Sequence, residues 1–312
     1  MPTDVAATPI EHLLALKAVQ PFSSLPPDDL ALLVERAKPR TLDAGEVLVE
    51  KGVPLESIHL VLAGRLEEHR DGQRWAIREP YELVGGVDAL ARTGEHLMVR
   101  ATEPTQTLEL ERDDLLEVCQ DRFGVLATVA AGVAAMAIAA RRRLGSSAGF
   151  TDPSADAAPP FGAREGDVAE IVARLHAIAA LGGIPIHTLA YAAAESELVT
   201  LDAGHALWRA GDPADHVVLV LSGRLACTSD DGRQRFALSA DEVAGALDAL
   251  ALAPRWYEAT AATRVVGLRL RIATLLDVLE DDPDTAIGAL IRFARATARL
   301  VAEVARTQPA GV

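Results

Sequence analysis

The segment Thr41–Leu66 reads TLDAGEVLVEKGVPLESIHLVLAGRL, and the segment Thr200–Leu225 reads TLDAGHALWRAGDPADHVVLVLSGRL. About half of the aligned positions are identical, and no gap is needed to align the two segments. Both carry three glycines at matching positions, where a tight turn needs a positive φ or a close backbone approach. Because a long internal repeat is the signature of one structural unit made more than once, we expect two domains of the same fold.

The sequence around each copy changes from helical to β-forming periodicity and back. In the first repeat, apolar residues lie at helical spacing before residue 38, β-forming runs follow to about residue 112, and helical spacing then returns. The second repeat has the same order, with β-forming runs from about Leu198 to Leu270. Many short strands bracketed by helices predict a mainly β fold with flanking α-helices, namely two antiparallel β jelly rolls.

The length of the chain agrees with the prediction of two domains. A chain of 312 residues corresponds to about two domains. Residues 145–165 are small, polar and proline-containing, as is typical of a linker. We therefore predict a first domain over residues 1–144 and a second domain over residues 166–312, each with a closing helix.

Charge and cysteine content exclude some classes of protein. The net charge of −15 disfavours sequence-independent binding to the phosphates of DNA or RNA, so we expect no nucleic-acid partner. The basic cluster Arg141–Arg143 is interpreted as a helix C-terminus, with a contact to an anionic partner as the alternative. Cys119 and Cys227 lie far apart and form neither a disulfide framework nor a metal site. Both this and the lack of a secretion signal favour the cytoplasm.

The most apolar stretch is Phe123–Ala140, a run of uncharged residues that precedes the basic cluster. Its length is near the lower limit for a membrane span, but it consists largely of alanine and glycine, which gain little from transfer into lipid. We therefore expect a soluble protein with no membrane partner. The small residues of Ala127–Ala140 favour close helix packing, within the chain, against a partner, or in a two-fold homodimer.

The repeats resemble the cyclic-nucleotide-binding domains of the catabolite-activator and protein-kinase-A regulatory-subunit families. The resemblance rests on residues 22–68, FSSLPPDDLALLVERAKPRTLDAGEVLVEKGVPLESIHLVLAGRLEE, and on residues 198–225, LVTLDAGHALWRAGDPADHVVLVLSGRL. It implies a jelly roll with helices before and after it, made twice. It also implies a phosphate-binding cassette, in which backbone N–H groups at the start of a short helix face the cyclic phosphate and an arginine adds a charge-assisted contact. A glutamate of the cassette accepts a hydrogen bond from the ribose 2′-hydroxyl.

In the first repeat, Gly85 matches the family glycine and Gly86 stands at the glutamate position. The arginine position falls at about Gly94 or Glu95. Asp88 lies in the first turn of the expected short helix, where a carboxylate suits the helix dipole but would repel a phosphate. Glu95 would add to that repulsion. The resemblance therefore implies that the first cassette has lost both polar anchors.

In the second repeat, Gly245 matches the family glycine and Ala246 stands at the glutamate position. Arg255 follows a proline and lies near the arginine position, one or two residues out of the usual register. Asp248 occupies the place that Asp88 has in the first repeat. The second cassette has therefore lost at least one anchor.

Two aromatic residues, Trp256 and Tyr257, follow Arg255 at the expected mouth of the second pocket. They form either a core plug that fills the space of a nucleotide or a stacking platform for a purine-like ligand. No glutamate accompanies them to orient a ligand, which favours the plug.

The sequence has no nucleophile elbow, no Walker loop and no pair of histidines at metal-binding spacing, so we expect no catalysis, no metal and no cofactor. We predict a non-catalytic cytoplasmic regulatory or scaffold protein that acts through contact with a protein partner and binds neither cyclic AMP nor cyclic GMP. The alternative is a ligand sensor whose second domain binds a cyclic nucleotide or another small anion.

Overall fold

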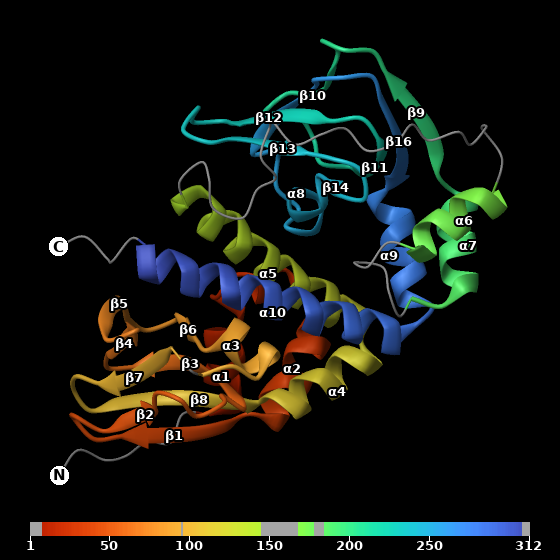
Figure 1. Ribbon diagram of the computed structural model, residues 1–312. Coiled ribbons are helices and arrows are strands. Elements are labelled where there is room, and N and C mark those ends of the chain that lie inside the picture. Colours follow the sequence, from red (N-terminus) through yellow and green to blue (C-terminus); the bar gives the residue numbers. More distant parts are fainter. Residues whose placement is uncertain (1–7, 95, 145–167, 178–183, 308–312) are drawn as a thin grey trace. The chain divides into compact units, whose positions relative to one another are not determined.

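The computed structural model describes residues 8–94, 96–144, 168–177 and 184–307 (Figure 1). The predicted linker, residues 145–165, and the candidate residue Glu95 lie outside the described residues. The chain divides into two compact units, one made of Met1–Met136 with Ile287–Val312 and the other made of Ala137–Ala286.

The first unit begins with helices, continues through eight strands and returns to helices, in the order that the sequence predicts. Its helices are α1 (Pro9–Lys17), the 3-10 turn η1 (Phe22–Ser24), α2 (Pro27–Arg36), α3 (Gly86–Ala91), α4 (Arg112–Asp121) and most of α5 (Phe123–Arg143). Its strands are β1 (Lys38–Leu42), β2 (Val47–Val49), β3 (Ser57–Ala63), β4 (Leu66–Arg70), β5 (Gln73–Arg78), β6 (Leu83–Val84), β7 (Leu97–Ala101) and β8 (Thr105–Glu111). They form two four-stranded antiparallel sheets, in the orders β1-β8-β3-β6 and β2-β7-β4-β5.

The second unit repeats this arrangement. Its helices are α6 (Val168–Ala177), α7 (Ile186–Ala194), α8 (Ala246–Leu250), α9 (Ile272–Glu280) and the start of α10 (Pro283–Thr307). Its strands are β9 (Glu197–Leu201), β10 (Ala206–Trp208), β11 (His216–Ser222), β12 (Leu225–Ser229), β13 (Arg235–Leu238), β14 (Val243–Ala244), β15 (Tyr257–Ala261) and β16 (Val265–Arg271). Their antiparallel sheets have the orders β14-β11-β16-β9 and β10-β15-β12-β13.

Equivalent strands therefore take equivalent places in the two units, which confirms the prediction of two mainly β jelly rolls with flanking helices. One glycine position, which is Gly64 in the first segment and Gly223 in the second, shows why the sequence is repeated. Gly64 and Gly223 have φ values of +83° and +84°. A Cβ atom at Gly64 would lie 2.4 Å from the carbonyl oxygen of Pro104, and one at Gly223 would lie 2.1 Å from that of Arg264. Both turns require glycine because a side chain has no room.

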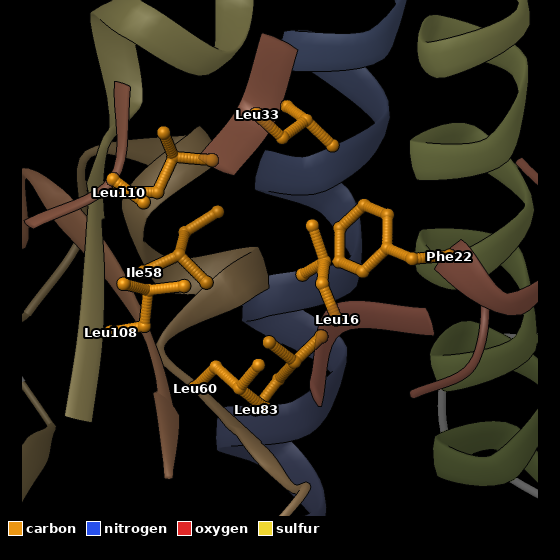
Figure 2. A pocket seen from close by; sticks show the side chains of 9 residues that line it. Leu16, Phe22, Leu33, Ile58, Leu60, Leu83, Leu108 and Leu110 are labelled. Carbon is orange, nitrogen blue, oxygen red and sulfur yellow. The ribbon is translucent and has the colours of Figure 1, made fainter. Parts of the chain in front are cut away.

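In the first unit, the helices before the jelly roll pack on the sheet that contains β3 and β8. Apolar side chains from both layers meet there and enclose a cavity of about 30 Å³, whose lining includes Leu16, Phe22 and Leu60 (Figure 2). A space of that size holds no more than a water molecule, and its walls offer a water no polar partner. The cavity is therefore a packing defect of the core and not a ligand site.

Two long helices cross the division between the units. The last turns of α5, from Ala137 onward, belong to the second unit, whereas Ile287–Thr307 of α10 belongs to the first. Each unit thus contains the end of a helix that the other repeat encodes. The domain limits expected from the sequence stay a prediction, since the segment between them lies outside the described residues.

Among the described residues, α5 is the helix whose length and composition would allow it to cross a membrane. Such a signal is weak evidence, because a buried helix of a soluble protein gives it too. Val125 and Ala134 are fully buried, and Ile138 is nearly so. The helix is therefore buried in part, over 39% of its most apolar stretch.

Candidate functional site

Both cassettes have the backbone shape that the resemblance implies. Gly85 and Gly245 stand immediately before α3 and α8, and both have a φ of +78°. The predicted short helix follows in each case, with Asp88 and Asp248 in its first turn. A carboxylate at that position is favourable for the partial positive charge of a helix N-terminus.

The polar anchors of the first cassette have no replacement at the same positions. Gly86 has open space where its side chain would be, so no neighbour has taken the place of a glutamate. A Cβ atom at Gly94 would lie 1.7 Å from the carbonyl oxygen of Val53, so the backbone there admits only glycine. The neighbouring candidate, Glu95, is outside the described residues.

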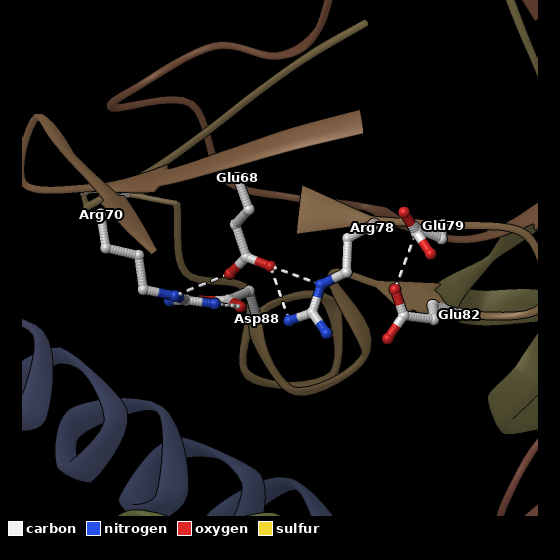
Figure 3. Close-up of polar contacts among 6 residues, drawn as sticks. All are labelled: Glu68, Arg70, Arg78, Glu79, Glu82 and Asp88. Atoms are coloured by element: carbon white, nitrogen blue, oxygen red, sulfur yellow. Dashed lines mark hydrogen bonds and ion pairs between the residues drawn. The ribbon is translucent and has the colours of Figure 1, made fainter. Parts of the chain in front are cut away.

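Asp88 is not the uncompensated negative charge that the sequence suggested. It is 6% exposed, and its two carboxylate oxygens accept hydrogen bonds from the Arg70 guanidinium at 3.1 and 2.7 Å. Arg70 also donates to Glu68 at 2.9 Å, and Arg78 donates to the other oxygen of Glu68 at 2.8 and 2.9 Å (Figure 3). Two carboxylates and two guanidinium groups therefore form a buried, electrically balanced network inside the first jelly roll.

The carboxylates around Arg70 favour its charged form. Burial alone would lower the pKa of Arg70, but the carboxylates of Asp88 and Glu68 outweigh it and raise that pKa. The sequence contained a signal for the network that was missed. Leu66, Glu68 and Arg70 alternate along β4, so the two charged residues share the inward face of the strand with a buried leucine.

In the second cassette, the arginine is buried inside its own domain. Arg255 is 1% exposed, and its guanidinium donates to the carbonyl oxygens of Gly245 at 3.1 Å and His216 at 2.5 Å. The guanidinium carbon lies 4.0 Å from the centre of the Trp208 ring, and a terminal nitrogen lies 3.5 Å from Asp248. The group that would hold a phosphate is therefore engaged by the protein.

The Arg255–Asp248 pair is less favourable than its counterpart in the first unit. Burial raises the pKa of Asp248 to about 6, against the opposing effect of Arg255. Burial likewise lowers the pKa of Arg255, although the Asp248 carboxylate opposes the change. Neither carboxylate oxygen of Asp248 has a hydrogen-bond partner among the described residues. The two groups thus lie 3.5 Å apart, and burial opposes the charged form of each.

The aromatic residues of the second cassette lie in the core. Trp256 and Tyr257 are 3% and 4% exposed and pack edge to face, with ring centres 5.1 Å apart. Phe236 stacks on Trp256, and Trp208 contacts Tyr257. The Tyr257 hydroxyl accepts a hydrogen bond from the backbone N–H of Gly245 at 2.8 Å. Of the two interpretations left open, this packing favours the core plug.

The remaining positions offer little chemistry. Ala246, at the glutamate position, begins α8 with a partly exposed methyl group. In the part of the chain that the structure describes, no group of three or more His, Cys, Asp and Glu side chains could hold a metal ion. Cys119 and Cys227 are buried, and burial raises the pKa of the Cys119 thiol to about 12. A buried thiol with that pKa is not a nucleophile.

Comparison with solved structures gives matches to kinase regulatory chains. The regulatory domain of protein kinase A from Toxoplasma gondii with cAMP is 17% identical, over 89% of this chain and 94% of that chain, with a TM-score of 0.34. The regulatory subunit of a cAMP-independent protein kinase A from Trypanosoma brucei is 16% identical, over 93% and 91%, with a TM-score of 0.36. A cyclic nucleotide-binding-like protein from Brucella abortus is 20% identical, over 35% and 97%, with a TM-score of 0.32. No curated protein sequence matches the chain.

Comparison with protein families is more specific. The sequence matches the cyclic nucleotide-binding domain over residues 39–122 and again over residues 198–282, which together exceed half of the chain. Each match covers one jelly roll and its cassette, apart from the first residue of the first strand. The chain therefore belongs to the cyclic nucleotide-binding domain family, with two such domains in tandem.

Proposed function

We propose that this protein is a non-catalytic regulatory or scaffold protein that acts through contact with a protein partner, and that neither domain binds a cyclic nucleotide. We further propose that the protein acts in the cytoplasm. The observation that carries it is the burial of the Arg255 guanidinium against Gly245, His216 and Trp208 in the second cassette.

The balance of free energies in the second domain supports this proposal. A phosphate would have to draw Arg255 away from two carbonyl oxygens and an indole ring, and would leave the Asp248 carboxylate buried without its cation. Each hydrogen bond from the guanidinium to a carbonyl oxygen is worth about 1.5–3 kcal/mol. One charge-assisted hydrogen bond to the ligand returns about 1.5–3 kcal/mol. The Gly245 N–H, which faces the phosphate in the family, is already bonded to the Tyr257 hydroxyl.

The first domain leads to the same conclusion by another route. Its cassette offers glycine at the glutamate position, and the arginine that contacts Asp88 of the cassette helix comes from β4. That arginine, Arg70, is shared between Asp88 and Glu68, so binding a phosphate would expose two carboxylates to it. The negative charges of these two carboxylates would repel the phosphate and oppose its binding.

The alternative function is a sensor of a small anion in the second domain. One observation favours it, namely the combined pKa shifts of Asp248 and Arg255, which indicate a pair under electrostatic strain. An anion that replaced the carboxylate as the partner of Arg255 would gain from that strain. The two functions differ in their prediction for the purified chain. The sensor should bind a cyclic nucleotide or another small anion in its second domain, whereas neither domain of the scaffold protein should bind a cyclic nucleotide.

Isothermal titration calorimetry of the full chain with cyclic AMP and cyclic GMP tests the proposal. We expect no heat of binding for either nucleotide at micromolar concentrations. Micromolar binding would support the sensor, and Arg255→Ala should then abolish it. Arg233→Ala is the matched control, since Arg233 is a well-exposed arginine of the same domain. Binding that survives Arg255→Ala would place the ligand outside the second cassette.

The contact with a protein partner needs its own experiment. Cross-linking of the full chain in cells, followed by mass spectrometry, should identify one protein partner. The amount of this partner cross-linked to the chain should not change when the concentration of cyclic AMP is raised. A yield that falls or rises with cyclic AMP would contradict the nucleotide-independent role.

A further inference from the structure

Three arginines line one side of α10, in a chain whose net charge is −15. Arg292, Arg295 and Arg299 are exposed, and they belong to the part of α10 that groups with the first unit (Figure 1). Residues three and four positions apart are neighbours on a helix surface, so the three side chains leave the helix on the same side. We call these three residues the arginine stripe. It spans about 10 Å along the helix axis.

The contacts of the fold do not neutralise the arginine stripe. Among the residues that the structure describes, no carboxylate lies within ion-pair distance of the three guanidinium groups, whereas Arg306 pairs with Glu303 at 2.6 Å. The helix dipole does not account for the stripe either, because its effect is confined to the last turn, where Arg306 is the basic residue. Like charges three and four residues apart destabilise a helix. The stripe therefore has a cost that no contact of the described residues offsets.

The equivalent helix of the first repeat shows that the fold does not need arginine at these positions. Helices α5 and α10 begin at the same distance after the equivalent strands β8 and β16. The positions of α5 that correspond to the arginine stripe are Gly132, Ala135 and Ala139. Ala135 and Ala139 are exposed as well. Small residues thus suffice on this side of the helix, and the arginines of α10 serve something other than folding.

Carboxylates are the natural partners of such a stripe. A guanidinium group pairs with a carboxylate through two parallel hydrogen bonds. Acidic residues three and four positions apart on a helix present their carboxylates on one side, at the spacing of the arginine stripe. We propose that the arginine stripe docks an acidic helix of the protein partner. This inference rests on the proposed function, in which the chain acts through a protein partner, and it names the chemistry of the surface that the partner presents.

A membrane and a nucleic acid match the arginine stripe less well. A helix that lies on a membrane needs large apolar side chains beside its cations. Along α10, within the described residues, no large apolar side chain is well exposed. A duplex would meet a chain of net charge −15, which opposes binding to its phosphates. A short acidic helix contacts the stripe without facing the rest of the acidic surface, so charge complementarity favours a protein segment.

Fluorescence anisotropy of the full chain with a labelled peptide tests the arginine stripe. The probe is an alanine-based helical peptide whose three glutamates share one side of the helix at the spacing of the stripe. The combined substitution Arg292→Ala, Arg295→Ala and Arg299→Ala should weaken binding of the peptide roughly tenfold, as expected for the loss of three exposed ion pairs. This variant should unfold at a temperature no lower than that of the wild type, because alanine is a better helix former and the repulsion between like charges is removed.

The matched control removes the same charge from another surface. Arg209, Arg233 and Arg235 are exposed arginines of the second unit. Their combined substitution by alanine should leave binding of the peptide unchanged. A second peptide has the same composition but carries its glutamates on different sides of the helix, and it should bind the wild type more weakly than the first peptide does.

Several results would overturn the inference. These are no binding of the first peptide to the wild type, equal binding to the wild type and the stripe variant, and equal binding of the two peptides. Tighter binding to phosphatidylserine vesicles or to duplex DNA than to the first peptide would replace the acidic helix by that ligand.

Cross-linking in cells separates this inference from the proposed function. Loss of the partner from the stripe variant, but not from the control variant, would support the docking of the partner on the arginine stripe. A partner that the wild type and the stripe variant capture equally would contradict the stripe and leave the proposed function intact. The absence of any partner for the wild type would contradict the proposed function itself.

Discussion

In each domain an arginine lies beside the cassette aspartate, yet the two pairs differ in their electrostatics. Arg70 donates to two carboxylates within hydrogen-bond distance, and its pKa is raised. Arg255 faces one carboxylate at 3.5 Å, and burial lowers its pKa. The first pair therefore stabilises its domain as an ion pair, whereas the second is tolerated because Arg255 is also hydrogen-bonded to carbonyl groups and stacked on Trp208.

Removing Arg70 should be costly for the first unit. Arg70→Met leaves the buried carboxylates of Asp88 and Glu68 without their shared cation, and we expect the free energy of unfolding to fall by about 3–5 kcal/mol. Lys38→Met is the control, because the Lys38–Glu111 pair is well exposed and should contribute less than about 1 kcal/mol. Urea denaturation measures both, and equal losses in the two variants would contradict the importance of the network.

The raised pKa of Asp248 predicts a dependence of stability on pH. Its pKa is about 6 in the folded protein against the ordinary 3.8, so the folded state binds the proton more tightly than the unfolded state does. The resulting stabilisation is fully present below pH 4 and is lost as the pH rises through 6. Between pH 4 and pH 7, the wild type should lose about 2 kcal/mol relative to Asp248→Asn, which cannot ionise. Urea denaturation across this range checks the prediction, and parallel curves for the two proteins would refute it.

At the scale of elements, the family resemblance implied the helix after each cassette glycine, and the change of periodicity predicted the succession of helices, short strands and helices in each repeat. The second feature depends on a local pattern, namely alternation along short strands. The partner of Asp88 could not be predicted in the same way, because Arg70 is distant in the sequence and the two meet only through the register of the jelly roll. The pattern LEEHR in β4 could have indicated inward-facing charges, since its counterpart in β12 reads LACTS.

Two positions of helix α5 differ in how closely they are packed. A Cβ atom at Gly132 would lie 2.9 Å from the Pro21 ring of the same unit, whereas Ala135 is exposed. Gly132→Leu should therefore destabilise the first unit by about 1–3 kcal/mol through overpacking. Ala135→Leu should leave stability unchanged, and thermal unfolding of both variants without detergent measures the difference.

The same pair of variants tests the predicted homodimer. If small residues of α5 form a seam between two copies, Ala135→Leu should lower the mass measured by light scattering without lowering stability. A wild type that is monomeric at all concentrations would contradict the dimer. A dimer that Ala135→Leu does not affect would place the interface on another element.

At the scale of the whole molecule, the repeat in the sequence hides an exchange of helix ends. Ile287–Thr307 follows the second repeat but groups with the first unit, and residues 137–143 follow the first repeat but group with the second. Periodicity predicts both helices. It contains no information on which unit each helix end joins, because two domains of one fold offer similar surfaces to the same kind of apolar stripe.

The location of α10 leads to a prediction about truncation. Leu290, Ala294, Val301 and Val304 of α10 are nearly or fully buried. Arg306, near the end of the helix, lies close enough to the β4–β5 turn to lower the pKa of Asp71, after the larger effect of His96. A chain that ends at residue 286 should therefore expose apolar surface of the first unit, although the deleted residues follow the second repeat.

Hydrogen exchange of the shortened chain should accordingly rise in the first unit, in β4, β5 and α3, while β12 and β13 of the second unit keep the protection that they have in the full chain. In the full-length protein, Leu290→Ala should give the same pattern, because it leaves a cavity in the first unit at a cost of about 2–5 kcal/mol. Faster exchange confined to the second unit would show that α10 supports the domain that encodes it. Each domain would then be an independent module, since neither would need a helix end from the other repeat.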